Sequence, residues 1–554
     1  MLANVFTKSV RDHWIGSTIA FISLVLMLLF AISVYRNFDV NIYQEMPEVM
    51  KNIMGIPPTA DAASLAISVY LAGVGSWALT GMIIAFGSGS IASEESNGTI
   101  GLLLCNPRSR NNVLISKTLA ITLLMVITVA GLWGASHLLT MMLGVNIQGM
   151  HVEAICVHLL AVVLFHGFLA LAIGAWTGNR GMAAGITTGI MIVSIFATGL
   201  LPLIEDWEDL ARIFPWHYLN SSEPLLNGID WGHIGILIGF TVLFFITSII
   251  GLNRRDLKSR NVGVTLMDRL RNYPLTQKVI SRLAGSTRVS RIWIKTFSEH
   301  QSLLIIIGYV MFLSSIMIGL LYDFMPIETM ARLIESYPEL KTIFAALGGG
   351  DFTTPEGFFQ LEIFSFMAPA ATLIAGIAVG TRALAGEESK NTMGLLLSNP
   401  VKRSRVVIEK SLTMIICCVI AGLVTFLGVA AGSLFGGLDM NMGNIAAACL
   451  LAVLLGLAFG MLALGLAAAT GQGKIASFGS IGLVLVSYIT ASFLPLSDNL
   501  AGYARWSPYY YYSGSEPIVN GLDPGHVAVL GIMAVALFIL SIYLFQRRDL
   551  RYNG

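Results

Sequence analysis

Two stretches of this chain carry adjacent glutamates in nearly the same sequence context. EESNGTIGLLLCNPRSR runs from Glu94 to Arg110, and EESKNTMGLLLSNPVKR runs from Glu387 to Arg403. Paired carboxylates could serve as a general acid and a general base. Neighbouring side chains on a helix point about 100° apart, however, so the carboxylates of one pair do not converge on one site. No nucleophile with a base lies near them in the sequence, so we expect no catalytic role.

Other residues that could do chemistry are few. GQGK at Gly471–Lys474 lacks the spacing of a phosphate-binding loop and follows no predicted strand, so we interpret it as a turn. The cysteines show no ligand spacing, and we interpret them as small apolar residues. They are Cys105, Cys156, Cys417, Cys418 and Cys449. The sequence therefore predicts no catalytic, cofactor-binding or metal-binding residue in this chain.

The elements that position the two glutamate motifs are expected to cross a membrane. Of the 554 residues, 55% are hydrophobic and only 12% are charged, whereas soluble domains are about 25% charged. The net charge of +1 implies no general attraction to nucleic acid. About 20 apolar residues cross the roughly 30 Å core of a bilayer as a helix. Such windows lie at 15–35, 64–88, 113–144, 153–176, 181–203, 233–252, 301–322, 361–383, 406–436, 443–469, 475–495 and 526–545. We predict an all-α polytopic membrane protein with twelve transmembrane helices.

The chain is a tandem repeat. The two motif copies are 293 residues apart, and 14 of the 24 positions from Glu94 to Lys117 are identical in the second copy. The same offset relates the SEP segments that begin at Ser222 and Ser515, and the RRDL segments that begin at Arg254 and Arg547. Because each copy holds six spans, an even number, both enter the membrane the same way round, as a parallel repeat of two six-helix units. The predicted division is a repeat at 1–252, a basic linker at 253–291 and a repeat at 292–554.

The lysines and arginines predict which side of the membrane each segment faces. The side that holds both motifs, both termini and the linker carries 27 of the 33 lysines and arginines. Cytoplasmic loops are enriched in these residues, so we expect both termini in the cytoplasm. The linker is expected to lie against anionic lipid headgroups, with docking of a partner as the alternative. Each repeat also opens with an amphipathic stretch, expected to lie in the plane of the interface.

Each motif is expected to form a short helix under the membrane, acidic at its start and apolar along one side. Proline ends a helix, so Pro107 and Pro400 should terminate it. One interpretation is a simple cap on the preceding span. A cap does not require the repeated GLLL run, however, and exposed leucines at Leu102–Leu104 and Leu395–Leu397 need a cover. We therefore favour docking of a partner protein.

Three histidines lie within predicted spans of the first half: His137, His158 and His166. Ionisable groups inside a membrane are functional candidates, so these residues are candidates for lining a transport path. A neutral histidine can equally serve as a structural hydrogen-bonding group between helices. The sequence leaves both possibilities open.

The pattern E-E-x-x-x-T-x-G-L-L-L-x-N-P followed by basic residues resembles the permease subunits of type-2 ABC transporters, over essentially the whole chain and twice. The resemblance implies that the motif is a coupling helix in a groove of a separate ATPase subunit, which binds ATP and Mg²⁺. Its acidic start would meet basic groups or backbone donors of that partner. It also implies that the SEP segment dips back into the outer leaflet. The coupling residues carried over are Glu94, Glu95, Thr99, Leu102 and Leu103 in the first repeat, and Glu387, Glu388, Thr392, Leu395 and Leu396 in the second.

The fused form resembles bacterial exporter permeases of the tetronasin, polyketide and multidrug type. This resemblance implies a permease of the bacterial inner membrane that moves a hydrophobic or amphipathic compound outward, with two copies of an ABC ATPase subunit as partners and no cofactor of its own. A transporter driven by an ion gradient is the first alternative, and it would need buried carboxylates at mid-span, which we do not find. An integral membrane enzyme is the second, and it would need clustered ionisable residues at one membrane face.

Overall fold

The computed structural model describes residues 4–35, 67–96, 99–105, 109–145, 147, 149–203, 207–257, 292–325, 327, 331–332, 335, 351, 353–389, 392–496 and 500–550. Within these ranges the chain is helical, without any strand. It divides into two compact units, Met1–Val262 and Gly263–Gly554. The division falls inside the segment that the sequence assigns to the basic linker, most of which, 258–291, lies outside the described residues.

Twelve helices in the described ranges are long and apolar enough to cross a membrane, and each overlaps one predicted window. The prediction of a twelve-span all-α protein in two six-helix units is therefore confirmed. The spans of unit 1 are α1 (Val5–Tyr35), η1 with α5 (Val69–Gly75, Ser76–Gly89), α8 (Arg110–Leu143), α9 (Val152–Thr177), α10 (Arg180–Leu200) and α13 (Trp231–Arg254). Those of unit 2 are α16 (Ile292–Asp323), α19, η4 and α20 (Pro355–Phe359, Gln360–Phe364, Met367–Ala383), α23 (Arg403–Phe435), α24 (Met442–Thr470), α25 (Gly473–Phe493) and α28 (Pro524–Arg547).

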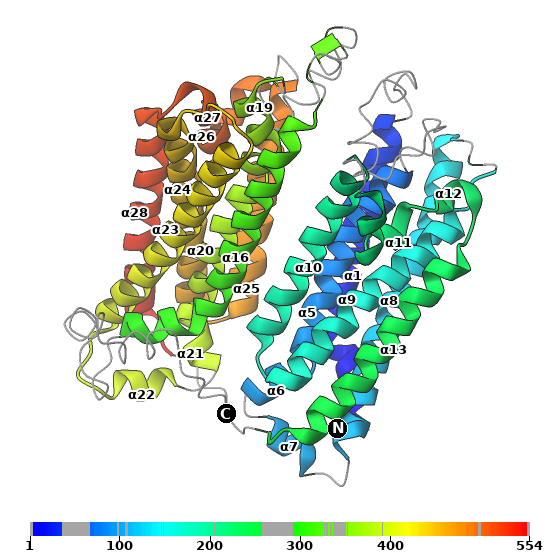
Figure 1. Cartoon of the computed structure of the whole chain (residues 1–554). Coiled ribbons are helices and arrows are strands. Elements are labelled where there is room, and N and C mark those ends of the chain that lie inside the picture. The colour runs from blue at the N-terminus through cyan, green and yellow to red at the C-terminus, as the bar shows by residue number, and fades with distance from the viewer. Residues whose placement is uncertain are drawn as a thin grey trace. The chain divides into compact units, whose positions relative to one another are not determined.

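The fourth span lies at the centre of each unit. In unit 1, α9 packs against α5, α8, α10 and α13, and in unit 2, α24 packs against α20, α23, α25 and α28 (Figure 1). Glycines allow the closest approach, because a Cβ on Gly87 would collide with the carbonyl of Gly167, and one on Gly380 with that of Gly460. Small residues at helix contacts favour association inside membranes, where no hydrophobic effect drives helices together. The two contacts occupy equivalent positions of the two repeats.

The amphipathic stretch that opens each repeat is not a separate helix. It is continuous with the first span, since α1 begins at Val5 and α16 begins at Ile292. Neither junction contains a proline that would end the helix, and the expectation that these stretches lie in the plane of the interface stays a prediction. At 1.5 Å per residue the 31 residues of α1 extend about 46 Å, longer than the roughly 30 Å core of a bilayer.

The segments before the sixth spans fold into short helices that pack on their own unit. They are η2 (Leu201–Leu203), η3 (Glu208–Ile213), α11 (His217–Asn220) and α12 (Pro224–Asn227), and η5 (Leu494–Leu496), η6 (Ala501–Trp506), α26 (Tyr510–Ser513) and α27 (Pro517–Asn520). The glutamates of both SEP sequences, Glu223 and Glu516, have left-handed backbones with φ of 49° and 45°. A glutamate in this conformation is uncommon, and the turn brings the apolar residues that follow, Leu225 and Ile518, into the core.

Candidate functional site

Each glutamate motif folds into two short helices rather than one. They are α6 (Ala92–Ser96) and α7 (Ile100–Leu104) in unit 1, and α21 (Ala385–Ser389) and α22 (Met393–Leu397) in unit 2. The chain turns at the motif threonine, whose amide donates to the carbonyl of the first glutamate at 2.9 Å in both copies, Thr99 to Glu94 and Thr392 to Glu387. The threonine hydroxyl also donates to the carboxylate of that glutamate. These contacts explain why a single continuous helix, as predicted, does not form.

In each unit the motif helices lie at the opposite end from the short helices of the SEP segment: α6 and α7 opposite α11 and α12, and α21 and α22 opposite α26 and α27 (Figure 1). Within its unit, each motif therefore lies at one end of the helix bundle. Its residues come directly after the second span and directly before the third. This placement agrees with the predicted position of the motif at a membrane face.

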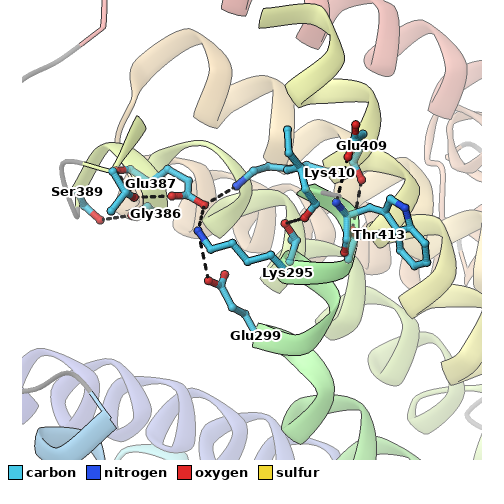
Figure 2. A network of polar contacts seen from close by, with 12 residues as sticks. Lys295, Glu299, Gly386, Glu387, Ser389, Glu409, Lys410 and Thr413 are labelled. Carbon is cyan, nitrogen blue, oxygen red and sulfur yellow. Dashed lines mark hydrogen bonds and ion pairs between the residues drawn. The ribbon is translucent and has the colours of Figure 1, made fainter. Parts of the chain in front are cut away.

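The first glutamate of each motif pairs with a lysine of the third span. Lys117 Nζ lies 2.7 Å from Glu94 Oε1 and donates to the carbonyl of Ser90 at 2.8 Å. In unit 2 the carboxylate of Glu387 lies between two lysines: Nζ of Lys410 at 3.0 Å and Nζ of Lys295 at 3.2 Å (Figure 2).

The lysines set the protonation state of these carboxylates. Burial by itself would raise the pKa of Glu387, but Lys410, Thr392 and Lys295 together outweigh it and lower the pKa from 4.5 to about 2. The pKa of Glu94 is lowered in the same way, since Lys117 and Thr99 outweigh the effect of burial. Both carboxylates are therefore ionised at neutral pH and have no capacity to act as a general acid.

The second glutamate of each motif pairs with an arginine at the end of the sixth span. Arg255 NH1 donates to Glu95 Oε2 at 2.8 Å, and Arg548 NH1 donates to Glu388 Oε2 at 3.1 Å. The second nitrogen of each guanidinium contacts the other carboxylate oxygen, so both pairs are bidentate. Glu95 is 0% exposed and Glu388 is 3% exposed. These are buried ion pairs, formed identically in the two repeats.

The same arginines also bind the end of the fourth span. Arg255 Nε donates to the carbonyl of Ala175 at 3.1 Å, and Arg548 Nε donates to that of Ala468 at 2.7 Å. Each guanidinium passes over a glycine that ends this helix in the left-handed conformation, Gly178 with φ 63° or Gly471 with φ 65°. A side chain at these glycines would collide with the arginine. The interpretation of GQGK as a turn is confirmed, because Gly471 is the C-cap of α24.

A second arginine ties the start of the third span to the end of the sixth. Arg110 NH1 donates to the carbonyl of Arg255 at 2.9 Å, and Arg403 NH1 donates to that of Arg548 at 2.7 Å. The motif, the third span, the fourth span and the sixth span of each unit are thus joined by one set of polar contacts. We call this set the motif bracket. It comprises Glu94, Glu95, Arg110, Lys117 and Arg255 in unit 1, and Glu387, Glu388, Arg403, Lys410 and Arg548 in unit 2.

The bracket changes the role assigned to the glutamates. The resemblance predicted that the acidic helix start meets a partner, but these carboxylates are paired inside their own repeat. The physical reason is that a carboxylate buried beside the helix ends requires a cation to offset its desolvation. The motif of unit 2 also exposes one apolar side chain: Leu395 is 71% exposed, while Leu396 and, in unit 1, Leu103 are half-buried. The side chain of Leu102 lies outside the described residues.

The partners of the glutamates were not recognised from the sequence. Arg255 and Arg548 belong to the RRDL segments, which repeat at the same 293-residue offset as the motif, and Lys117 and Lys410 end the matching 24-residue stretch. A charged residue shared by both copies at the end of an apolar span was the available signal. The sequence does not reveal that the glutamate and the arginine, 160 positions apart, lie next to each other in the folded protein.

Two of the three candidate histidines make structural contacts. His158 is fully buried; it accepts from the amide of Asp230 at Nε2 (3.2 Å), so its Nδ1 carries the proton and donates to the carbonyl of Tyr218 (2.8 Å). His166, also fully buried, contacts the carbonyl of Val162 one turn earlier through Nδ1 at 2.9 Å. His137 is exposed and packs edge-on against Trp133. These contacts favour structural roles for His158 and His166.

A large cavity lies in unit 2 between α20 and α25. Its volume is about 1110 Å³, and residues from Phe366 to Ser389 and from Gly471 to Tyr509 line it. Among the described residues no group of three or more His, Cys, Asp or Glu side chains is arranged to hold a metal ion. The five cysteines are free, with Cys105 exposed and the others buried.

Comparison with known families gives one result for both halves of the chain. The model of a family described as ABC-2 family transporter protein matches residues 3–257 and again residues 301–550. The two matches together cover most of the chain and coincide with the two repeats. No curated protein matches the chain significantly.

Proposed function

Because this chain belongs to the ABC-2 family of transporter proteins and is a multi-pass membrane permease component of an ABC transporter, we propose that it is an exporter permease. It moves a hydrophobic or amphipathic compound outward across the bacterial inner membrane, with both termini in the cytoplasm. Membership of the family implies pairing with an ABC ATPase subunit. We propose that two such subunits bind one chain and that they hold the ATP and Mg²⁺.

The motif bracket is the observation that carries the coupling role. A helix that receives force from a partner must transmit it to the spans, which requires stiff contacts rather than a flexible loop. Glu388 ties α21 to the end of α28 through Arg548, and Arg403 ties the start of α23 to the same place. Movement of the motif would therefore shift the second, third and sixth spans together. Glu95, Arg255 and Arg110 form the same connection in unit 1.

The exposed surface of the motif supports a docking role. Leu395 presents 71% of its surface at the end of unit 2 that holds the motif. An exposed leucine next to a rigid, charge-paired base fits an apolar groove on a partner, since the centre of an interface is usually apolar and its rim polar. In this proposal the leucines supply the contact. The glutamates hold the leucines in position.

The cavity between α20 and α25 supports an apolar or amphipathic substrate. Binding sites for small molecules are commonly concave, mostly apolar and roughly 300 to 1,000 Å³ in volume. The cavity is of this size or slightly larger and is lined mainly by apolar side chains. The outward direction is the one that the resemblance to ABC exporters implies.

ATP-dependent transport by the reconstituted complex tests this proposal. The chain is co-purified with the ATPase subunit that binds it and is placed in vesicles with the motif side of the protein facing outward. Uptake of a fluorescent amphipathic dye into these vesicles is then followed. Uptake should require ATP and the ATPase subunit, and the chain alone should neither hydrolyse ATP nor concentrate the dye. Uptake driven by a proton or sodium gradient without ATP would contradict the proposal.

A further inference from the structure

The cavity of unit 2 has two chemically different regions. Apolar side chains of α20 and α25 line most of it, including Leu373, Ile374, Ile377, Ile481, Val484 and Leu485. At the end nearest the motif the lining changes to Arg382 and Lys474, together with the polar Thr381, Gln472 and Ser389. Among the described residues that line it there is no aspartate or glutamate. A molecule that fills this space meets an apolar wall along its length and two cations at one end.

The two cations are available to a ligand. Arg382 and Lys474 are exposed, and neither forms an ion pair with any residue in the described ranges. Other cations at this face, such as Lys410 and Arg548, are engaged by the motif glutamates. An arginine offers a planar fork of donors that matches a carboxylate, sulfate or phosphate group, and a lysine adds a mobile point charge.

The first repeat lacks this pair. At the 293-residue offset, Gly89 stands in place of Arg382 and Gly181 in place of Lys474. The neighbouring cation of that repeat, Arg180, lies across Gly89, with Nε 3.6 Å from the position of a Cβ on that glycine. An arginine side chain at position 89 would therefore meet Arg180, and the pair Arg382 and Lys474 has no counterpart at positions 89 and 181.

The apolar wall differs between the repeats in the same way. Phe366 and Phe478 line the cavity of unit 2, and their counterparts at the same offset are Gly73 and Gly185. Glycine presents no side chain to a ligand, whereas phenylalanine contributes a large apolar surface. The interface preference of lysine and arginine explains basic residues at a membrane face, but it does not explain why aromatic residues and paired cations line one cavity of the same repeat.

We propose that unit 2 alone binds the transported molecule, and that this molecule is a single-tailed amphiphile with an anionic head. The head lies on Arg382 and Lys474, and the tail lies along α20 and α25 toward Phe366. This inference rests on the proposed transport function and specifies its substrate class. Charge complementarity selects this occupant, since the described lining offers two cations and no acidic group to the head of such a molecule.

Binding to the purified full chain tests the inference without ATP or the ATPase subunit. The chain is placed in discs of zwitterionic lipid and titrated with three dansyl-labelled probes that share one medium-length alkyl tail and end in a carboxylate, a primary amide or an amine. The carboxylate probe should bind at least about tenfold more tightly than the other two, the difference expected for a charge-assisted hydrogen bond of roughly 1.5 kcal/mol. Equal binding of all three would overturn the inference.

Variants locate the binding to unit 2. Combining Arg382→Gln with Lys474→Gln should lower the affinity for the carboxylate probe about tenfold or more and leave the affinity for the amide probe unchanged. Arg180→Gln in unit 1 is the matched control and should change the affinity for neither probe. Phe478→Gly, which introduces the residue of the first repeat, should lower the affinity for both probes because it removes an apolar contact with the alkyl tail. An Arg180→Gln effect as large as that of the double variant would overturn the assignment to unit 2.

Competition separates the proposed amphiphile from a membrane lipid with the same head chemistry. Replacing part of the zwitterionic lipid by anionic phosphatidylglycerol should leave probe binding nearly unchanged, whereas an unlabelled alkyl carboxylate should displace the probe. Displacement by the anionic lipid would assign the site to a lipid headgroup and overturn the inference. The two proposals can fail separately. ATP-dependent transport by a chain that does not prefer anionic probes refutes only this inference. Transport that does not depend on ATP refutes the proposed transport function.

Discussion

The guanidinium of Arg548 forms a bidentate ion pair with the carboxylate of Glu388, 160 positions earlier in the chain. It joins the motif after the second span to the end of the sixth span, and the equivalent pair in unit 1 does the same. A buried ion pair is weak evidence for net stability, because desolvation offsets the attraction, but removing one partner leaves an uncompensated charge. Removing one partner of the pair by mutation should therefore have a large and measurable effect on stability.

Glu388→Gln should destabilise the protein by about 3 to 5 kcal/mol, because the guanidinium of Arg548, only 14% exposed, would lose its counter-charge. Thermal unfolding of the detergent-purified chain measures this. Glu299→Gln is the matched control, since Glu299 is 43% exposed and lies 3.9 Å from Lys295; it should cost between about 0 and 1 kcal/mol. Equal effects of the two variants would show that the buried pair has no special role. A reversal such as Glu388→Lys should impair folding as well as coupling.

Leu395→Asp should weaken binding of the ATPase subunit while the permease keeps its fold. Loss of a central apolar contact commonly costs about 2 kcal/mol, which corresponds to roughly thirtyfold in affinity. Binding of the purified ATPase subunit to immobilised permease gives the affinity, and thermal unfolding reports the fold. Leu395→Met keeps the apolar surface and should retain most of the affinity. Unchanged binding of Leu395→Asp would argue against docking through this residue.

The low pKa of Glu387 predicts how acid affects the motif of unit 2. The pKa is about 2 in the folded protein against an ordinary 4.5, because Lys410, Thr392 and Lys295 together outweigh the effect of burial. A lowered pKa contributes stability that is fully present above the unfolded value and is lost as pH falls through the folded value. The difference in unfolding temperature between wild type and Glu387→Gln should therefore be constant above about pH 5 and shrink from there toward about pH 2. A difference that is unchanged over this range would refute the assignment.

One chain should bind two ATPase subunits. A six-span permease has one motif and needs a second copy to engage two partners, whereas this chain carries two complete motif brackets. The copies differ in sequence, with Asn97 against Lys390 and Gly98 against Asn391, so the two docking sites should have unequal affinities. Native mass spectrometry of the assembled complex gives the composition. A complex of two chains with two ATPase subunits, or of one chain with one, would contradict this prediction.

Local patterns in the sequence were sufficient for the architecture. Twelve apolar windows and the 293-residue offset are each readable without knowing which helices touch, and the observed spans agree with them. Element ends were less predictable. The turn at Thr99 and Thr392, which divides the motif into two helices, depends on a hydrogen bond to a glutamate five residues earlier. A helical pattern in the sequence does not reveal such a competing local contact.

Hydrophobic length and repeated residues are properties of the chain alone, so the class, the repeat and the motif were predictable from the sequence. The partners of the charged motif residues, in contrast, follow from the fold. From the sequence alone, Glu95 and Glu388 would be taken for surface carboxylates. In the folded protein each lies beside an arginine from the end of another span. The cavity lined by Arg382, Lys474 and Phe478 likewise exists only where α20 and α25 come together. The physical reason is that burial and charge pairing depend on which elements meet, and residues far apart in the chain meet only in the folded protein.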